Sequence, residues 1–152
     1  MDKTLGYWIE KLLGLIIGLV MIFLFFKFWH HGNFISNSQF LDKLITISTT
    51  LFGFLLTVLT LIVQSESEAV TKMKAHGSYS RLINFNKNIV LLSGLVCLLS
   101  LFLSFCNELL KCRSELLLKV FSTINLGAFT WVIVDTLIFT LIFYKILLSE
   151  KK

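Results

Sequence analysis

The chain has 152 residues, of which 56% are hydrophobic and 15% are charged, and it carries a formal net charge of +5. A mean hydropathy of +0.84 excludes an ordinary water-soluble domain, which needs many more polar side chains at its surface. We therefore predict one integral membrane domain over residues 1–152, whose basic charge serves membrane topology and contact with anionic lipid.

Four long apolar runs predict an all-α, antiparallel bundle of four transmembrane helices, because crossing ~30 Å of hydrocarbon takes about 20 helical residues. The chain contains no proline that would break such helices. The expected spans cover about residues 5–29, 42–64, 82–106 and 119–147. The connections are too short to hold a soluble domain with a core of its own.

Lysine and arginine predict the orientation, since short cytoplasmic loops carry an excess of them. With four spans, nine of these residues fall on the side of both termini and the middle connection, and five fall on the other side. We predict a multi-pass membrane protein with its N- and C-termini in the cytoplasm.

The first run contains Gly14 and Gly18 in a GxxxG pattern, which lets two helix backbones approach closely. Close packing is the expected role of this pair. The connection that follows contains His30 and His31. Adjacent residues on a helix point in different directions and no nearby acid or cysteine completes a ligand set, so anchoring at the membrane interface is favoured over a metal site.

Small and polar residues form a narrow seam along each of the two middle spans. The second span places them at Thr46, Thr50, Gly53, Thr57 and Thr60, and the third at Ser93, Cys97, Ser100 and Ser104. Steps of three and four put each set on one helix face. We expect the two seams to pack against each other in a tight hairpin; the alternative is that one seam lines a narrow hydrated path.

The connection between these spans is the largest polar segment and carries the basic residues Lys72, Lys74, Arg81 and Lys87. These residues serve topology and lipid contact, or form a docking surface for a cytoplasmic protein. A nucleic-acid site needs a clustered basic face with aromatic residues on a soluble module, so no direct nucleic-acid partner is expected.

The last span contains Asp135, the only Asp, Glu, Lys or Arg within the four apolar runs, which cover residues 12–26, 44–63, 89–106 and 121–144. An acid near the membrane centre costs roughly 2.5–3.5 kcal/mol, so Asp135 must face protein or water or be protonated. Asn125, Thr136 and Thr140 lie on the same broad side of the helix. We expect one intramembrane polar site, directed to the bundle centre or to an oligomer axis.

We predict no catalytic site, no metal and no cofactor. The sequence contains no Ser-His-Asp set, ligand cluster or phosphate loop. The cysteines form no CxxC pair, and nothing distinguishes a free Cys112 from a cross-linking one.

The segment LFGFLLTVLTLIV at Leu51 to Val63 and the HGSYSRL turn at His76 to Leu82 carry a resemblance. With the order of the spans, they resemble small bacterial four-span membrane proteins of anti-phage defence loci, among them the membrane subunit of the Kiwa system. The resemblance implies an oligomeric component of the bacterial inner membrane that senses infection and works with a cytoplasmic, DNA-acting partner.

The sequence and the resemblance leave two alternative functions. The first is a homo-oligomeric subunit, with a tetramer as the best guess, that senses infection and recruits a cytoplasmic partner through the basic turn. The second is a small ion channel or pore-forming effector whose path is lined by the threonine seam and Asp135.

Overall fold

The computed structural model describes residues 3–28, 38–64, 70–71, 74, 78–108 and 115–149. Four long helices and no strand occur in these ranges. The helices are α1 (Lys3–Phe28), α2 (Ser38–Gln64), α4 (Ser78–Glu108) and α5 (Glu115–Ser149). The predicted all-α class is therefore confirmed for the described part of the chain.

The helices are long because nothing in their sequences interrupts them. They contain 26, 27, 31 and 35 residues, and the chain has no proline. Three have apolar stretches long enough to cross a membrane: Phe40–Gln64, Tyr79–Cys106 and Leu117–Lys145; α1 has a shorter one, Leu12–Phe28. In hydrocarbon a helix satisfies every backbone polar group within itself. The chain is a multi-pass membrane protein by these criteria.

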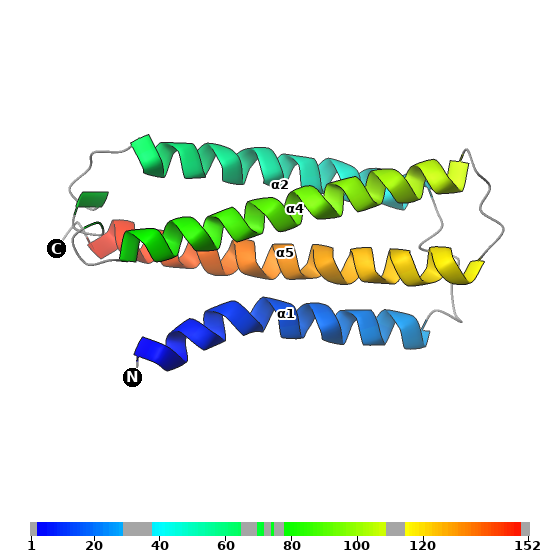
Figure 1. The fold of residues 1–152 in the computed structure, drawn as a ribbon, viewed down its shortest axis with the longest axis horizontal. Coiled ribbons are helices and arrows are strands. Elements are labelled where there is room, and N and C mark those ends of the chain that lie inside the picture. The colour runs from blue at the N-terminus through cyan, green and yellow to red at the C-terminus, as the bar shows by residue number, and fades with distance from the viewer. Residues whose placement is uncertain are drawn as a thin grey trace.

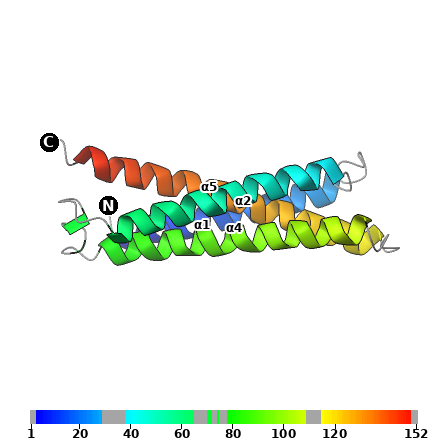
Figure 2. The ribbon, with the colours of Figure 1, turned by 90° about the horizontal axis from the view of Figure 1, so that it is seen from above.

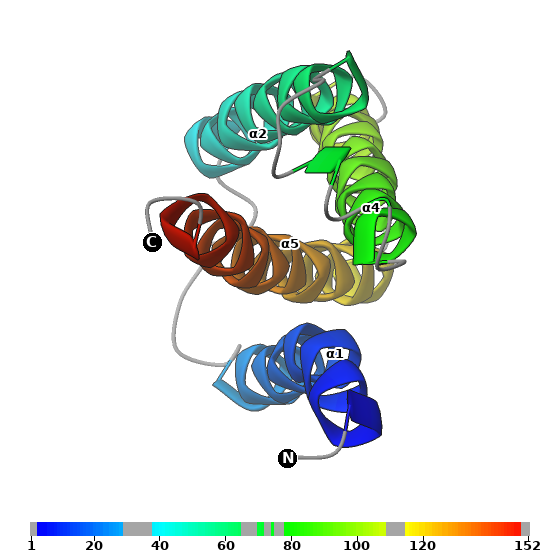
Figure 3. The same cartoon turned by 90° about the vertical axis from the view of Figure 1, so that its left-hand side faces the viewer.

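The helices form an open arc. The main contacts join α2 to α4, α4 to α5 and α5 to α1, and the end view shows this order from top to bottom (Figure 3). The start of α1 and the end of α5 lie at the same end of the molecule (Figure 1). Viewed from above, α5 is inclined to α4 (Figure 2). α1 is thus an edge helix that rests mainly on α5.

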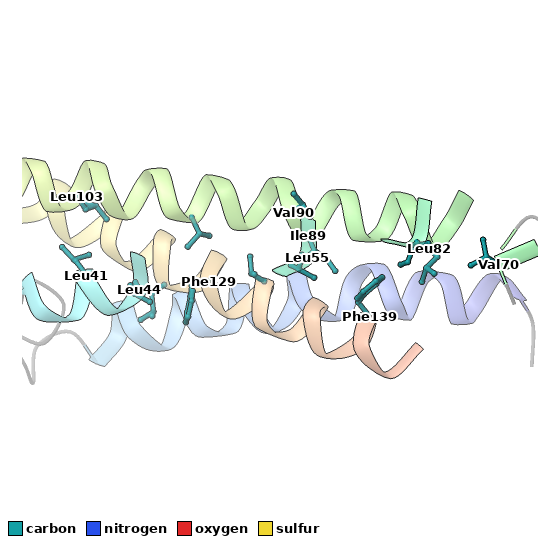
Figure 4. Packing of buried hydrophobic residues seen from close by; sticks show 14 residues of the cluster. Leu41, Leu44, Leu55, Val70, Leu82, Ile89, Val90, Leu103, Phe129 and Phe139 are labelled. Atoms are coloured by element: carbon teal, nitrogen blue, oxygen red, sulfur yellow. The ribbon is translucent and has the colours of Figure 1, made fainter. Parts of the chain in front are cut away.

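The core follows a heptad pattern on α2 and α4. The inward positions of α2 are Leu41, Leu44, Ser48, Leu51, Leu55, Val58 and Ile62; those of α4 are Leu82, Asn86, Ile89, Ser93, Val96, Ser100 and Leu103. Steps of three and four keep one stripe of each helix against its neighbour, as in a coiled coil. Leu55 and Ile89 lie side by side at mid-length (Figure 4).

α5 and the segment after α2 complete this core. Phe139 of α5 packs against Phe85 of α4, with ring centroids 6.4 Å apart. Val70, which lies between α2 and α4, belongs to the same cluster near Leu82 (Figure 4). Apolar contacts therefore run along the length of the three-helix part.

The outer surface is also apolar. Large exposed side chains include Phe23 of α1, Phe54 of α2, Leu98 of α4 and Leu141 of α5. In water such a surface would be an aggregation liability, whereas acyl chains solvate it well. Side chains buried inside the bundle therefore stabilise it through packing contacts, because they would not be in contact with water in the membrane either.

Replacing Leu55, which has no exposed surface, with alanine should lower the free energy of unfolding by on the order of 1–3 kcal/mol, because a cavity opens between α2 and α4. Leu61→Ala removes the same atoms from a 62% exposed position on the same helix and should change stability little. Unfolding in mixed micelles with rising SDS measures both. Equal losses would contradict the packing of α2 on α4.

Candidate intramembrane site

Three glycines bring α1 and α5 into close contact. A Cβ added at Gly18 would lie 2.9 Å from the carbonyl oxygen of Gly127 and 3.1 Å from Trp131 Cβ. A Cβ added at Gly127 would in turn overlap the side chain of Ile22. The backbones therefore meet where ordinary side chains would hold them apart. Gly14 and Gly18 are both buried at this contact, with Gly127 as their counterpart on α5.

Asp135 lies in the same contact and is only 7% exposed. Its carboxyl group fills the space that a side chain at Gly14 would need, with Cγ 2.8 Å from the ideal Cβ position. One turn earlier on α5, the Nε1–H group of Trp131 donates a 2.8 Å hydrogen bond to Asp135 Oδ2. Asp135 Oδ1 has no hydrogen-bond partner in the described part of the chain. The acid is therefore covered by α1.

The broad polar site expected on the last span is divided. Thr136 donates to the carbonyl oxygen of Val132 at 2.7 Å, and Thr140 donates to that of Thr136 at 2.8 Å, so both hydroxyls are satisfied within α5. Thr140 is exposed. Asn125 is buried and bonded to α4. Asp135 faces neither the centre of α2, α4 and α5 nor an open axis, because α1 lies over it.

Asn125 belongs to a second polar group, between α4 and α5. Its Nδ2 donates a 2.7 Å hydrogen bond to Ser100 Oγ, which itself donates to the carbonyl oxygen of Val96. One turn away on α4, Cys97 Sγ lies 3.2 Å from Thr49 Oγ1 of α2. These contacts place polar side chains of α2, α4 and α5 at a similar depth.

Asn86 is a third buried polar residue and has no exposed surface. It occupies a heptad position of α4, and its Nδ2 donates a 3.3 Å hydrogen bond to the carbonyl oxygen of Leu55 on α2. A single asparagine at such a position favours one register of two packed helices, because shifted registers leave its amide unpaired. Asn86 therefore positions α4 against α2.

The two small-residue seams do not face each other. On α4, Ser93 and Ser100 have no exposed surface, and Cys97 and Ser104 are half-buried. On α2 the seam lies on the outer surface: Thr46, Thr50, Gly53, Thr57 and Thr60 are all exposed. A Cβ at Gly53 would meet nothing within 4 Å. The expected tight hairpin of matching seams is therefore not found, because α2 uses its leucine-rich heptad to contact α4.

The threonines on the outer face of α2 are satisfied within the helix. Each hydroxyl donates to the carbonyl oxygen four residues earlier, at 2.8–2.9 Å, in Thr46, Thr50, Thr57 and Thr60. They therefore impose no unsatisfied donor on the lipid. We call this surface, formed by the four threonines and Gly53, the outer face of α2.

The basic residues lie near the end of the bundle where α2 ends and α4 begins. Lys74, Arg81 and Lys87 are exposed. Lys74 Nζ lies 5.3 Å from the ring centroid of Tyr79, a cation–π distance. Lys72, His30, His31 and Cys112 lie outside the described residues. No group of three or more metal-ligating side chains occurs in the described ranges.

The residues that sequence reasoning missed are Trp131, Gly127, Asn86 and Ser48. Gly127, Trp131 and Asp135 follow one another by steps of four, a signal visible in the sequence. Ser48 Oγ is buried and has no partner within the described chain. Its burial becomes visible only once the leucine heptad of α2 is recognised as the inward face.

No family model, curated protein or solved structure matches this chain. Its functional interpretation therefore depends on the contacts described above and on the expectations drawn from its sequence.

Replacing Gly14 with alanine should lower the free energy of unfolding by about 1–3 kcal/mol, because the new Cβ collides with the carboxyl group of Asp135. Gly94→Ala is the matched control on α4: its Cβ would lie 3.4 Å from the Phe52 ring, close to ordinary contact distance. Titration with SDS measures both variants. A Gly14 variant as stable as the control would contradict the close α1–α5 contact.

Proposed function

We propose that this chain is a homo-oligomeric subunit of a bacterial anti-phage defence system, which senses infection at the inner membrane and recruits a cytoplasmic protein. The observation that carries the oligomeric part is the outer face of α2. The defence role follows from the resemblance of Leu51 to Leu82 to small four-span proteins of such loci. A tetramer is our best guess for the assembly.

The outer face of α2 supports self-association because it is unlike the other lipid-facing surfaces. Many outward positions of α4 and α5 are large, as at Leu98 and Leu141, whereas this face has four threonines around the open position Gly53. Small residues let two membrane helices approach and gain dispersion contacts that lipid tails supply less well. Because the hydroxyls are already bonded, such an interface needs no polar partner.

The basic end supports recruitment. Exposed Lys74, Arg81 and Lys87 lie near the end that also holds the start of α1 and the end of α5 (Figure 1). The excess of lysine and arginine on this side of the sequence favours a cytoplasmic location for it. A positive surface there would attract an acidic patch on a soluble partner.

The alternative of an ion channel receives no support from the placement of its proposed lining. Helix α2 lies at one edge of the arc and α1 at the other (Figure 3). The threonines on the outer face of α2 are exposed, and Asp135 lies under α1 on α5. Residues of one protomer therefore do not line one path. Conduction would require a path built between copies.

Self-association is tested by Thr57→Phe. A large ring on the outer face of α2 should weaken association by at least about tenfold, equivalent to roughly 1.4 kcal/mol. Thr140→Phe is the control, because Thr140 is also an exposed threonine bonded within its own helix. Energy transfer between labelled copies, followed on dilution in liposomes, measures association. Unchanged association, or the same loss in both variants, counts against the interface.

Recruitment is tested by the triple change Lys74→Glu, Arg81→Glu and Lys87→Glu. Reversing these charges should weaken partner binding at least about tenfold, since like charges then meet across the contact. Affinity purification from cells that also express the neighbouring genes measures binding, and phage challenge measures protection. Lys43→Glu, at an exposed site near the opposite end, should leave both unchanged. Full partner recovery with the triple variant would argue against the basic surface.

A further inference from the structure

The strongest unexplained feature is the unpaired oxygen of Asp135. Oδ2 accepts a hydrogen bond from Trp131, whereas Oδ1 has no partner among the described residues although the side chain is more than nine-tenths buried. An ionised carboxylate in this position would leave a full charge with a single hydrogen bond in surroundings of low dielectric constant. Such a charge is costly unless a cation lies beside it.

The described basic side chains on the packed helices lie far from this carboxyl group along their axes. Lys11 of α1, whose side chain lies outside the described ones, precedes Gly14 by only three residues, so an ion pair between Lys11 and Asp135 is an outcome that the test below has to exclude. On α5 the neighbouring basic residues are Lys119 and Lys145, and the nearer one follows Asp135 by ten residues, about 15 Å along the helix. The described side chains of α1 include one basic residue, Lys27, thirteen positions after Gly14 and about 20 Å along the axis. On α4, Lys87 is exposed.

We propose that Asp135 is a proton-binding site, held as the neutral acid with its hydrogen on Oδ1 and with the Trp131 indole donating to the carbonyl oxygen Oδ2. The two oxygens then have different roles that match their surroundings. Oδ2 accepts the hydrogen bond of the indole, as a carbonyl oxygen does. Oδ1 lies against Gly14 without a partner among the described residues, and an unpaired hydroxyl there costs much less than an unpaired full charge. Gly14 is small enough for the acid to fit, and α1 shields it from lipid.

This assignment is independent of recruitment and of oligomeric state. It concerns a contact within one protomer, and it gives the α1–α5 pair a neutral polar centre instead of a buried charge. The proposed site depends on three features: a glycine on α1, an indole one turn before the acid on α5, and the lack of a basic residue within the apolar runs.

Infrared spectroscopy of the full chain in liposomes tests the proposal at neutral pH. A protonated carboxylic acid has a carbonyl stretching band separate from the carboxylate bands. We expect this band in the wild type, its downshift in deuterated buffer, and its loss in Asp135→Asn. Asp42→Asn, which changes an exposed acid on α2, is the matched control and should retain the band. The asparagine side chain keeps an acceptor and a donor in the acid's place, so Asp135→Asn should still fold.

A second variant tests which oxygen holds the hydrogen. Trp131→Phe removes the hydrogen bond to Oδ2, so the carbonyl band should move to higher frequency while remaining present. A band that does not move would overturn the assignment of the hydrogen to Oδ1.

Three other results would overturn proton binding at Asp135. The first is the absence of the band in the wild type. The second is a band that persists in Asp135→Asn and disappears in Glu10→Gln, which would place the proton on the acid one turn before Gly14. The third is loss of the wild-type band on adding sodium chloride, which would indicate a cation site.

Discussion

The close approach of α1 to α5 is the contact on which the rest of the structure depends. An acid in the last span has to be kept from the acyl chains, and α1 does this only because Gly14 leaves room for the carboxyl group. A larger residue at Gly14, Gly18 or Gly127 would separate the helices and open Asp135 to lipid. At the other end of the same pair, Lys119 Nζ lies 4.9 Å from the Phe26 ring, so contacts extend along α1.

Much of the fold was predictable because the membrane leaves few choices. Apolar runs without proline have to be helices in hydrocarbon, and their lengths set the expected spans. The role of Gly14 and Gly18 was also readable from their spacing. So was the need to cover Asp135, since no lysine or arginine occurs in the apolar runs. The partner helix was not readable, because the GxxxG pattern does not say which helix it contacts.

The inward face of α2 was not predictable from periodicity alone. This helix has two stripes with steps of three and four: one of leucines, near Leu55, and one of threonines, near Thr57. In water the leucines would face inward, but lipid removes that preference. The threonines did not have to pack either, since each hydroxyl bonds to its own helix. Which stripe of α2 faces α4 depends instead on how the side chains of the two helices fit together and on Asn86, whose amide donates a hydrogen bond to the α2 backbone.

The arc also separates the acid from the surface proposed for self-association. Helix α2 lies at one edge of the arc and α1 at the other (Figure 3). If copies meet through the outer face of α2, the shared interface therefore forms away from α1, which covers Asp135. Each protomer would then cover its own acid, and assembly would not depend on it. A substitution at Thr57 should therefore act on association, and one at Asp135 on the α1–α5 pair. Sites this far apart and without shared contacts have nearly additive effects on stability, so a strong coupling between them would mean that copies meet through α1 instead.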